Sequence, residues 1–166
     1  MRKCVFGALG LLAVLAVTAV AQDNSMTLAP MATSKFVNMP GVPACLKVAV
    51  QRGDPSKGPA VLLLKFTPGC LVPWHWHTAG EQLIVVSGSG KLEMKDGKPA
   101  VTKGGDYAYL PAKGVHQFKA TTAVTMFDMP DAAFDIHYVD TNGKEIPPDQ
   151  ALKPAKKMSA PTKKPS

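Results

Sequence analysis

Residue types that bind transition metals lie close together in one stretch of this chain, residues 69–88, which read GCLVPWHWHTAGEQLIVVSG. His75 and His77 are two positions apart, so in a β-strand their side chains point to the same face. Glu81 follows after a short turn, and a third imidazole, His116, comes later in the segment GVHQF. Three imidazoles and one carboxylate suit a divalent first-row metal. The spacing therefore predicts a metal site made by His75, His77, Glu81 and His116.

An H-x-H pair alone is also typical of a solvent-facing polar strand, and a single downstream histidine adds little. What favours a metal site is the combination of Glu81, the flanking glycines and His116, which lies behind a second run of glycine and proline. Three neutral imidazoles and one carboxylate leave a divalent ion with one net positive charge. An ion that prefers six ligands then keeps two positions for water, dioxygen or a chelating substrate. Iron or manganese is favoured for oxygen chemistry, while nickel, copper and zinc also accept these donors.

The same residues resemble the cupin family. The first cupin motif is G-x5-H-x-H-x3-E-x6-G, and every fixed position is matched, by Gly69, His75, His77, Glu81 and Gly88. The resemblance implies a jelly-roll β-barrel in which these histidines and the glutamate hold a metal ion inside the cavity.

The second cupin motif, G-x5-P-x-G-x2-H-x3-N, is matched in part. Gly105, Pro111 and His116 are in place, but Lys113 stands where the inner glycine is expected. The glycine is displaced to position 114, and the final asparagine is replaced by alanine. These departures concern the shape of the loop before His116 more than the ligand itself.

The pattern of the chain from residue 35 to 149 predicts one all-β domain, a single jelly-roll barrel. Glycine and proline recur between short apolar runs, and no stretch shows sustained helical periodicity. Asp96-Gly97 is a strong hairpin signal. The expected strands are Ala44–Gln51, Ala60–Phe66, Trp74–Thr78, Glu81–Val86, Lys91–Lys95, Ala100–Lys103, Tyr107–Leu110, Val115–Lys119, Val124–Asp128 and Phe134–Val139.

The positions of other side chains in these strands predict which way they face and what they contact. Trp74 and Trp76 should face away from the ligands, in packing or a dimer interface. Phe118 should form part of the cavity wall, and Tyr107 and Tyr109 should line the cavity or fill the barrel. His137 is interpreted as structural, because the ligand set is complete without it. The remaining acids are expected to mark strand ends: Asp128, Asp131, Asp135 and Asp140.

Residues 1–21 have the features of a cleaved secretory signal peptide. Arg2 and Lys3 precede an apolar run, and Ala19-Val20-Ala21 is a small-residue cleavage site. The alternative is a membrane anchor, but the cleavage site favours removal, so no stable membrane insertion is expected. We predict an exported, periplasmic protein with a flexible leader at residues 22–34.

Export would leave two cysteines, Cys45 and Cys70, in an oxidising compartment. An even pair there permits one disulfide. Two buried reduced thiols, which pack as small apolar side chains, are an equally good interpretation.

The net charge of +7 arises at the two ends of the chain. Of nineteen Lys and Arg residues against twelve Asp and Glu, two lie in residues 1–21 and five after residue 152. The remaining twelve balance the twelve acids, so the domain is neutral and no nucleic-acid partner is expected. Residues 150–166, rich in Lys and Pro, are predicted to be a disordered basic tail.

Cupins with this ligand set include quercetinase-like dioxygenases, oxalate-acting enzymes, isomerases and binding proteins. We therefore expect a metal-dependent oxidoreductase of the dioxygenase type that acts on a small organic substrate. Apolar strands and the lack of a basic cluster outside the tail favour an apolar or aromatic substrate. The alternatives are a non-catalytic periplasmic protein that binds metal or a small ligand, and a barrel with only a structural role. The resemblance also implies a homodimer, which would cover open sheet edges.

Overall fold

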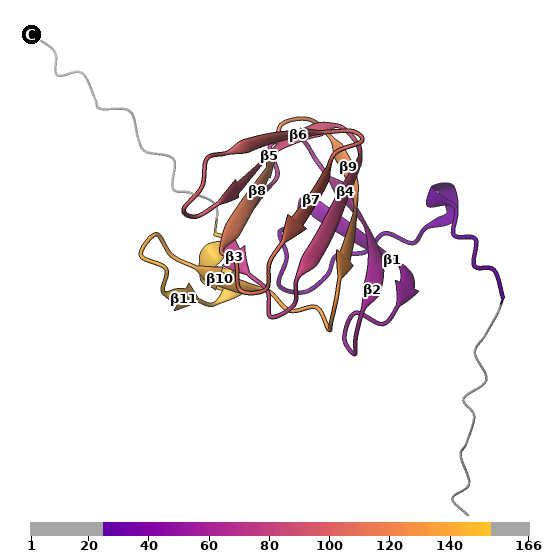
Figure 1. The fold of residues 1–166 in the computed structure, drawn as a ribbon, viewed down its shortest axis with the longest axis horizontal. Coiled ribbons are helices and arrows are strands. Elements are labelled where there is room, and N and C mark those ends of the chain that lie inside the picture. The colour runs from indigo at the N-terminus through magenta and orange to yellow at the C-terminus, as the bar shows by residue number, and fades with distance from the viewer. Residues whose placement is uncertain (1–24, 154–166) are drawn as a thin grey trace, which may run out of the picture.

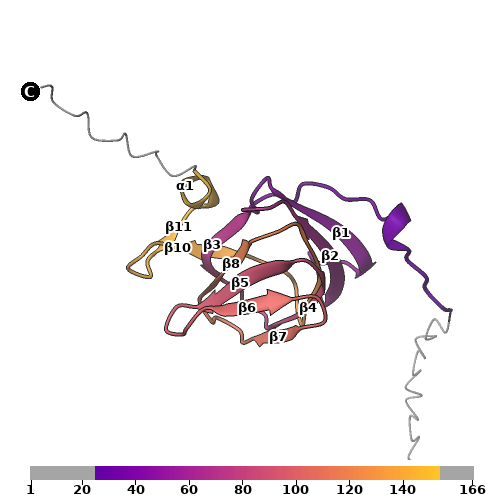
Figure 2. The ribbon, with the colours of Figure 1, turned by 90° about the horizontal axis from the view of Figure 1, so that it is seen from above.

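The structure is a computed structural model, and it describes residues 25–153. Two antiparallel sheets face each other in a jelly-roll barrel (Figures 1 and 2). The first has the order β1 (Leu46–Gly53), β2 (Ala60–Phe66), β9 (Val124–Pro130), β4 (Glu81–Ser87) and β7 (Tyr107–Leu110). The second has the order β11 (Glu145–Ile146), β10 (His137–Val139), β3 (Leu71–Trp76), β8 (His116–Ala120), β5 (Ser89–Met94) and β6 (Ala100–Lys103). The all-β jelly-roll prediction is confirmed.

Alternation of buried and accessible residues explains how the strands enclose one core. On β9 every second residue from Val124 to Pro130 is buried, and on β4 the buried positions are Glu81, Leu83 and Val85. These positions pair across the ladder, Val85 opposite Met126 and Glu81 opposite Pro130, so both strands present the same face to the interior. A polar residue at one of these inward positions must therefore lie in the barrel interior.

Every segment predicted as a strand overlaps an observed strand, and the differences are at the boundaries. The third predicted strand begins at Trp74, directly after Pro73, whereas β3 begins at Leu71. The β3–β8 register shifts between Val72 and His75, and such an irregularity tolerates a proline that cannot donate a ladder hydrogen bond. Strand β3 ends at Trp76, and His77 lies just beyond it.

The C-terminal part of the described chain contributes two elements that the sequence did not predict. Strand β11 pairs with β10, and the short helix α1 (Pro148–Ala151) follows it on the outside of the barrel (Figure 2). Ala151 and Leu152 pack against the core, beyond the expected domain boundary at residue 149. At the other end lies a short 3-10 helix, Met31–Thr33. The predicted signal peptide and most of the predicted tail fall outside the described residues. Within residues 25–153, no helix is long and apolar enough to cross a membrane.

Cys45 and Cys70 form a disulfide, which decides between the two interpretations of this pair. Their Cα atoms lie 5.6 Å apart, within the usual range for the bond. Cys45 immediately precedes β1, and Cys70 immediately precedes β3. The bond therefore ties the edge of one sheet to the strand of the other sheet that carries His75.

Candidate metal centre

The fold brings the four predicted ligands together from three strands and the segment that follows β3. His75 lies on β3 directly opposite His116, the first residue of β8. His77 follows β3, and the turn after it leads to Glu81, the first residue of β4 in the facing sheet. All four side chains are buried, with exposed fractions of 3–5 %. The polar-surface interpretation of the H-x-H pair is therefore wrong.

The three imidazoles are oriented by backbone carbonyl groups. Nδ1 of His75 hydrogen-bonds the Pro73 carbonyl at 2.7 Å, and Nδ1 of His116 hydrogen-bonds the Gly114 carbonyl at 2.8 Å. Nδ1 of His77 hydrogen-bonds the Asp135 carbonyl. A carbonyl oxygen can only accept, so each Nδ1 must carry the hydrogen and each neutral ring keeps its lone pair on Nε2.

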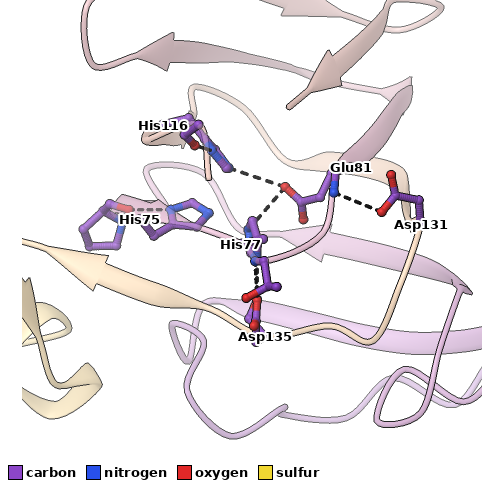
Figure 3. A network of polar contacts seen from close by, with 10 residues as sticks. His75, His77, Glu81, His116, Asp131 and Asp135 are labelled. Atoms are coloured by element: carbon purple, nitrogen blue, oxygen red, sulfur yellow. Dashed lines mark hydrogen bonds and ion pairs between the residues drawn. The ribbon is translucent and has the colours of Figure 1, made fainter. Parts of the chain in front are cut away.

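These lone pairs converge beside a carboxylate. The ligand atoms of His75, His77 and His116 all lie within 4.8 Å of one another. Oε2 of Glu81 is 3.2 Å from Nε2 of His77 and 3.5 Å from Nε2 of His116 (Figure 3). Lone pairs and a carboxylate placed this close repel one another unless a cation or a proton lies between them.

Burial sets the protonation of the cluster. It lowers the pKa of His75 well below its usual value of 6.5, lowers that of His116, and lowers that of His77 to about 4. Burial also raises the pKa of Glu81 to about 7. Near neutral pH the histidines are therefore uncharged, which is the form that ligates metals. Three neutral imidazoles and an ionisable carboxylate fit a divalent transition metal, with His75, His77, His116 and Glu81 as its donors.

Asp128 is a further buried acid in the site, and its prediction as a strand-end residue is wrong. Strand β9 continues to Pro130, so Asp128 lies inside the strand and faces inward between Leu62 and Leu83. It is 4 % exposed, and its carboxyl group is close enough to that of Glu81 for each acid to influence the pKa of the other. Burial, followed by the neighbouring Glu81, raises its pKa well above the usual value. Val124, Met126 and Asp128 occupy alternate positions of the strand, and this spacing could have indicated that Asp128 faces inward with the two apolar residues.

The loop before His116 explains the imperfect second motif. Lys113, at the expected glycine position, has φ of +61°, the left-handed conformation that favours glycine. The backbone conformation expected of the glycine is thus adopted by a lysine, and a left-handed conformation at a residue other than glycine costs roughly 1–2 kcal/mol of conformational free energy. The Lys113 N–H donates to the His77 carbonyl at 2.8 Å, so this loop also fixes the segment that carries the second histidine.

The loop between β9 and β10 holds the same segment from the other side. Besides the Asp135 carbonyl, which accepts from His77, the Asp135 side chain accepts from the Thr78 N–H at 2.8 Å (Figure 3). The carboxylate of Asp131 accepts from the Gly80 N–H at 3.0 Å. The turn between the second histidine and Glu81 is therefore fixed at both of its ends.

His137 lies outside the ligand cluster, next to this loop. Its Nδ1 hydrogen-bonds Glu145 at 2.8 Å, its Nε2 lies 3.2 Å from Asp135, and its ring stacks on Trp76 at 3.9 Å. Partial burial lowers the pKa of His137, but the two carboxylates outweigh it and the net shift is upward from 6.5. Trp76 faces away from the ligands, as predicted, and stacks on this outer histidine.

Replacing His137 with Gln should destabilise the protein in acid but not in base. The pKa of His137 is raised in the folded state, so its charge stabilises the fold fully below the unfolded pKa of 6.5 and loses this effect as pH rises through the folded value. Thermal melts should show the variant a few degrees lower than wild type at about pH 5.5 and little different at about pH 9. An equal loss at both pH values would assign the effect to stacking on Trp76.

An apolar cavity of about 60 Å³ opens beside the cluster. The four predicted ligands and Asp128 are its polar lining, and the remainder is aliphatic, methionine and phenylalanine side chains, including Phe118 as predicted. Tyr107 and Tyr109 do not line it. They are 59 % and 55 % exposed on edge strand β7, so the prediction that they line or fill the barrel is wrong.

Comparisons with known proteins agree with this architecture. Residues 62–130, from β2 to β9, match the family model described as "Cupin domain". An RmlC-like cupin from Shewanella frigidimarina shares 18 % identity over 66 % of this chain and 92 % of its own, with a TM-score of 0.55. An RmlC-like cupin from Ralstonia eutropha shares 21 % identity over 70 % and 74 %, with a TM-score of 0.57.

The polyketide cyclase RemF from Streptomyces resistomycificus shares 17 % identity over 77 % of this chain and 99 % of its own, with a TM-score of 0.60. A search of curated proteins found no match. At these identities the solved structures show the fold alone. The family model and the motif that carries the histidines support a small cupin domain that includes residues 62–130, and the solved structures agree with its single-barrel fold.

Proposed function

We propose that this protein is a metal-dependent oxidoreductase of the dioxygenase type that acts on a small organic substrate. The observation that carries the proposal is the convergence of three buried, uncharged imidazoles on one carboxylate at the wall of an apolar cavity. His75, His77, His116 and Glu81 would hold one divalent transition metal. When bound, such a metal supplies Lewis acidity and, if it is redox-active, the activation of dioxygen.

The residues of the chain itself would hold the metal, orient its ligands and exclude bulk water from the site. The carbonyls of Pro73, Gly114 and Asp135 fix the imidazole tautomers, so Nε2 is available without rearrangement. The apolar walls keep bulk water from the reacting groups, which strengthens every electrostatic interaction there. Iron or manganese is the favoured ion, since mixed nitrogen and oxygen donors suit both and both support oxygen chemistry.

Metal content tests the proposal directly. The mature protein, purified without an affinity tag, should contain about one equivalent of metal per chain by elemental analysis. A His75→Ala, His77→Ala double variant should contain little. Wild type loaded with iron(II) or manganese(II) should then consume dioxygen with a small aromatic substrate, and the double variant should not. A wild type that takes up no divalent ion even after reloading would overturn the proposal.

A non-catalytic metal-binding or ligand-binding protein is the second candidate. It is favoured by one observation: apart from the predicted ligands and Asp128, the described residues that line the cavity have no side chain able to act as general acid or base. If this second candidate is right, the protein should retain its metal in the elemental analysis and consume no dioxygen with any substrate tried.

A further inference from the structure

The cavity beside the ligand cluster comes close to solvent at one end. Among the described residues that line it, Met39, Val42, Phe134 and Ile136 are half-buried, and all of the others are buried. Met39 and Val42 belong to the segment before β1, and Phe134 and Ile136 to the loop between β9 and β10. A ligand that enters from solvent therefore has to pass between these two segments.

An outer groove of about 290 Å³ lies at this end of the cavity. The inner cavity, at about 60 Å³, is only several times the 10–15 Å³ that one water needs, so it holds a small group and not a whole ring system with substituents. Three side chains line both spaces and form a dividing wall between them: Met39, Phe134 and Ile136. The other residues that line the groove are Pro40, Pro55, Ser56 and Asp135.

Phe134 links the dividing wall to the ligand cluster. Its ring centroid lies 5.1 Å from that of His77, and Figure 3 shows its neighbour Asp135 directly beside His77. The Phe134 N–H donates to the Pro55 carbonyl at 2.8 Å, which holds the backbone of this loop. In the facing segment, the Gly41 carbonyl accepts from the Tyr138 hydroxyl at 2.9 Å. With both backbones held, rotation of side chains alone can open the wall.

The lining of the groove restricts the chemistry of what it can hold. No lysine or arginine is among the described residues that line the groove or the cavity. The charged side chain of the groove is Asp135, which is already engaged by the Thr78 N–H and by His137. An anionic group in the groove would therefore face a carboxylate and find no side-chain cation. The remaining surface is mostly apolar, which suits an uncharged apolar group.

The geometry points to an elongated, uncharged apolar ligand that has one end in the inner cavity and the remainder in the outer groove, with Phe134 controlling entry. This deepens the proposed function and rests on it, because it assigns the substrate class of the same cavity. Phe134 is then a specificity residue, and the groove selects ligands by length and charge.

Straight-chain primary alkanols from butanol to octanol test the length of the site. Dissociation constants would be measured by NMR titration with the mature protein, first metal-loaded and then metal-free. In both forms affinity should rise about fourfold with each added methylene through octanol, because the lengthening chain is buried in the groove. An affinity that stops rising at butanol or pentanol, or no binding of any alkanol, would overturn the proposal.

Octanoate tests the charge preference of the groove in the metal-free protein. It should bind at least about tenfold more weakly than octanol, because its carboxylate would meet Asp135 without a cation. Pro40 lines the groove and not the cavity. At low salt Pro40→Lys should therefore raise the ratio of octanoate to octanol affinity about threefold, with butanol affinity unchanged. Pro40→Ala is the matched control and should keep the wild-type ratio. A ratio that Pro40→Lys leaves unchanged would show that the chain does not lie in the groove.

Substitutions of Phe134 test its control of entry. In Phe134→Leu the association and dissociation rates of octanol, measured by NMR line-shape analysis, should both rise, because the wall is thinner. In Phe134→Trp both rates should fall by about tenfold, while the affinity changes less. Phe118→Leu is the control, since Phe118 is buried and lines only the cavity, and it should change affinity without changing the association rate. Association rates equal to wild type in both Phe134 variants would show that ligands enter elsewhere.

The readouts separate this inference from the proposed function. A protein that retains no metal, yet binds octanol with the expected dependence on length and on Pro40→Lys, would remove the oxidoreductase and keep the elongated site. A protein that retains metal and consumes dioxygen, but whose alkanol affinity stops rising at butanol, would do the reverse. If a Phe134 variant does not fold, the alkanol series and the two Pro40 variants still decide whether the groove holds the ligand.

Discussion

Replacing His116 with Ala should abolish most of the stabilisation that a divalent metal gives to the folded protein. A ligand that binds only the native state stabilises it by RT ln(1 + [L]/Kd). At a metal concentration a thousand times Kd, the midpoint of thermal unfolding of wild type should rise on the order of 10 °C. Removing one of four donors should weaken binding by about 100-fold or more, so the variant should gain only a few degrees. Differential scanning calorimetry with and without manganese(II) or zinc(II) measures both values.

His137→Ala is the matched control for this experiment. It removes a histidine from the same sheet, but from the outer position where the ring stacks on Trp76 and contacts two carboxylates. Its metal-induced shift should equal that of wild type, even if its baseline stability is lower. A His116→Ala protein with the full shift would show that His116 is not a ligand.

Removing the disulfide should produce the largest loss of stability in the absence of metal. Cys45 and Cys70 are separated by 25 positions, and closing a loop of this size contributes about 3 kcal/mol through the unfolded chain. For a domain of this size the double variant Cys45→Ala, Cys70→Ala should therefore unfold on the order of 10 °C lower in thermal melts. The metal-induced shift should persist, because the bond lies at the opposite end of β3 from His75.

Alkylation under denaturing, non-reducing conditions checks the pairing. Neither Cys45 nor Cys70 should be labelled in wild type, whereas Cys70 should be labelled in Cys45→Ser. Labelling of both thiols in the unreduced wild type would mean that the bond does not form in solution, and the stability difference should then be small.

Three of the four predicted ligands could be located from the sequence because short-range spacing fixes them. Two histidines at strand periodicity, a turn and a carboxylate occupy seven consecutive positions, so a strand and a reversal suffice to bring them together. The pairing of β3 with β8 then supplies His116 from a distant segment, which the resemblance to cupins anticipated. Their role as metal ligands stays a prediction for the experiments above.

The predictions that failed concern where strands end and which of their faces is buried. The predicted strand Val124–Asp128 was two residues too short, so an inward-facing acid was expected to mark a strand end, whereas β9 continues to Pro130. Tyr107 and Tyr109 lie on the same face of β7, as their spacing predicts. Spacing alone, however, does not say which face of an edge strand is buried. Strand β11 pairs with β10 across the short turn 140–144, so its signal was local and was missed, whereas the packing of Ala151 and Leu152 against the core depends on long-range contacts.

The hydrogen bonds from His75, His77 and His116 to backbone carbonyls are made by the fold itself, so we expect the three rings to be oriented before any metal binds. A metal would then bind as a separate event, and its identity would be decided by competition among the ions around the folded protein. In such a competition copper and zinc outbind iron and manganese at equal concentration, following the Irving–Williams order. A preparation can therefore carry whichever ion its surroundings supplied. Only the folded protein, emptied and reloaded with each ion in turn, reports which metal supports its chemistry.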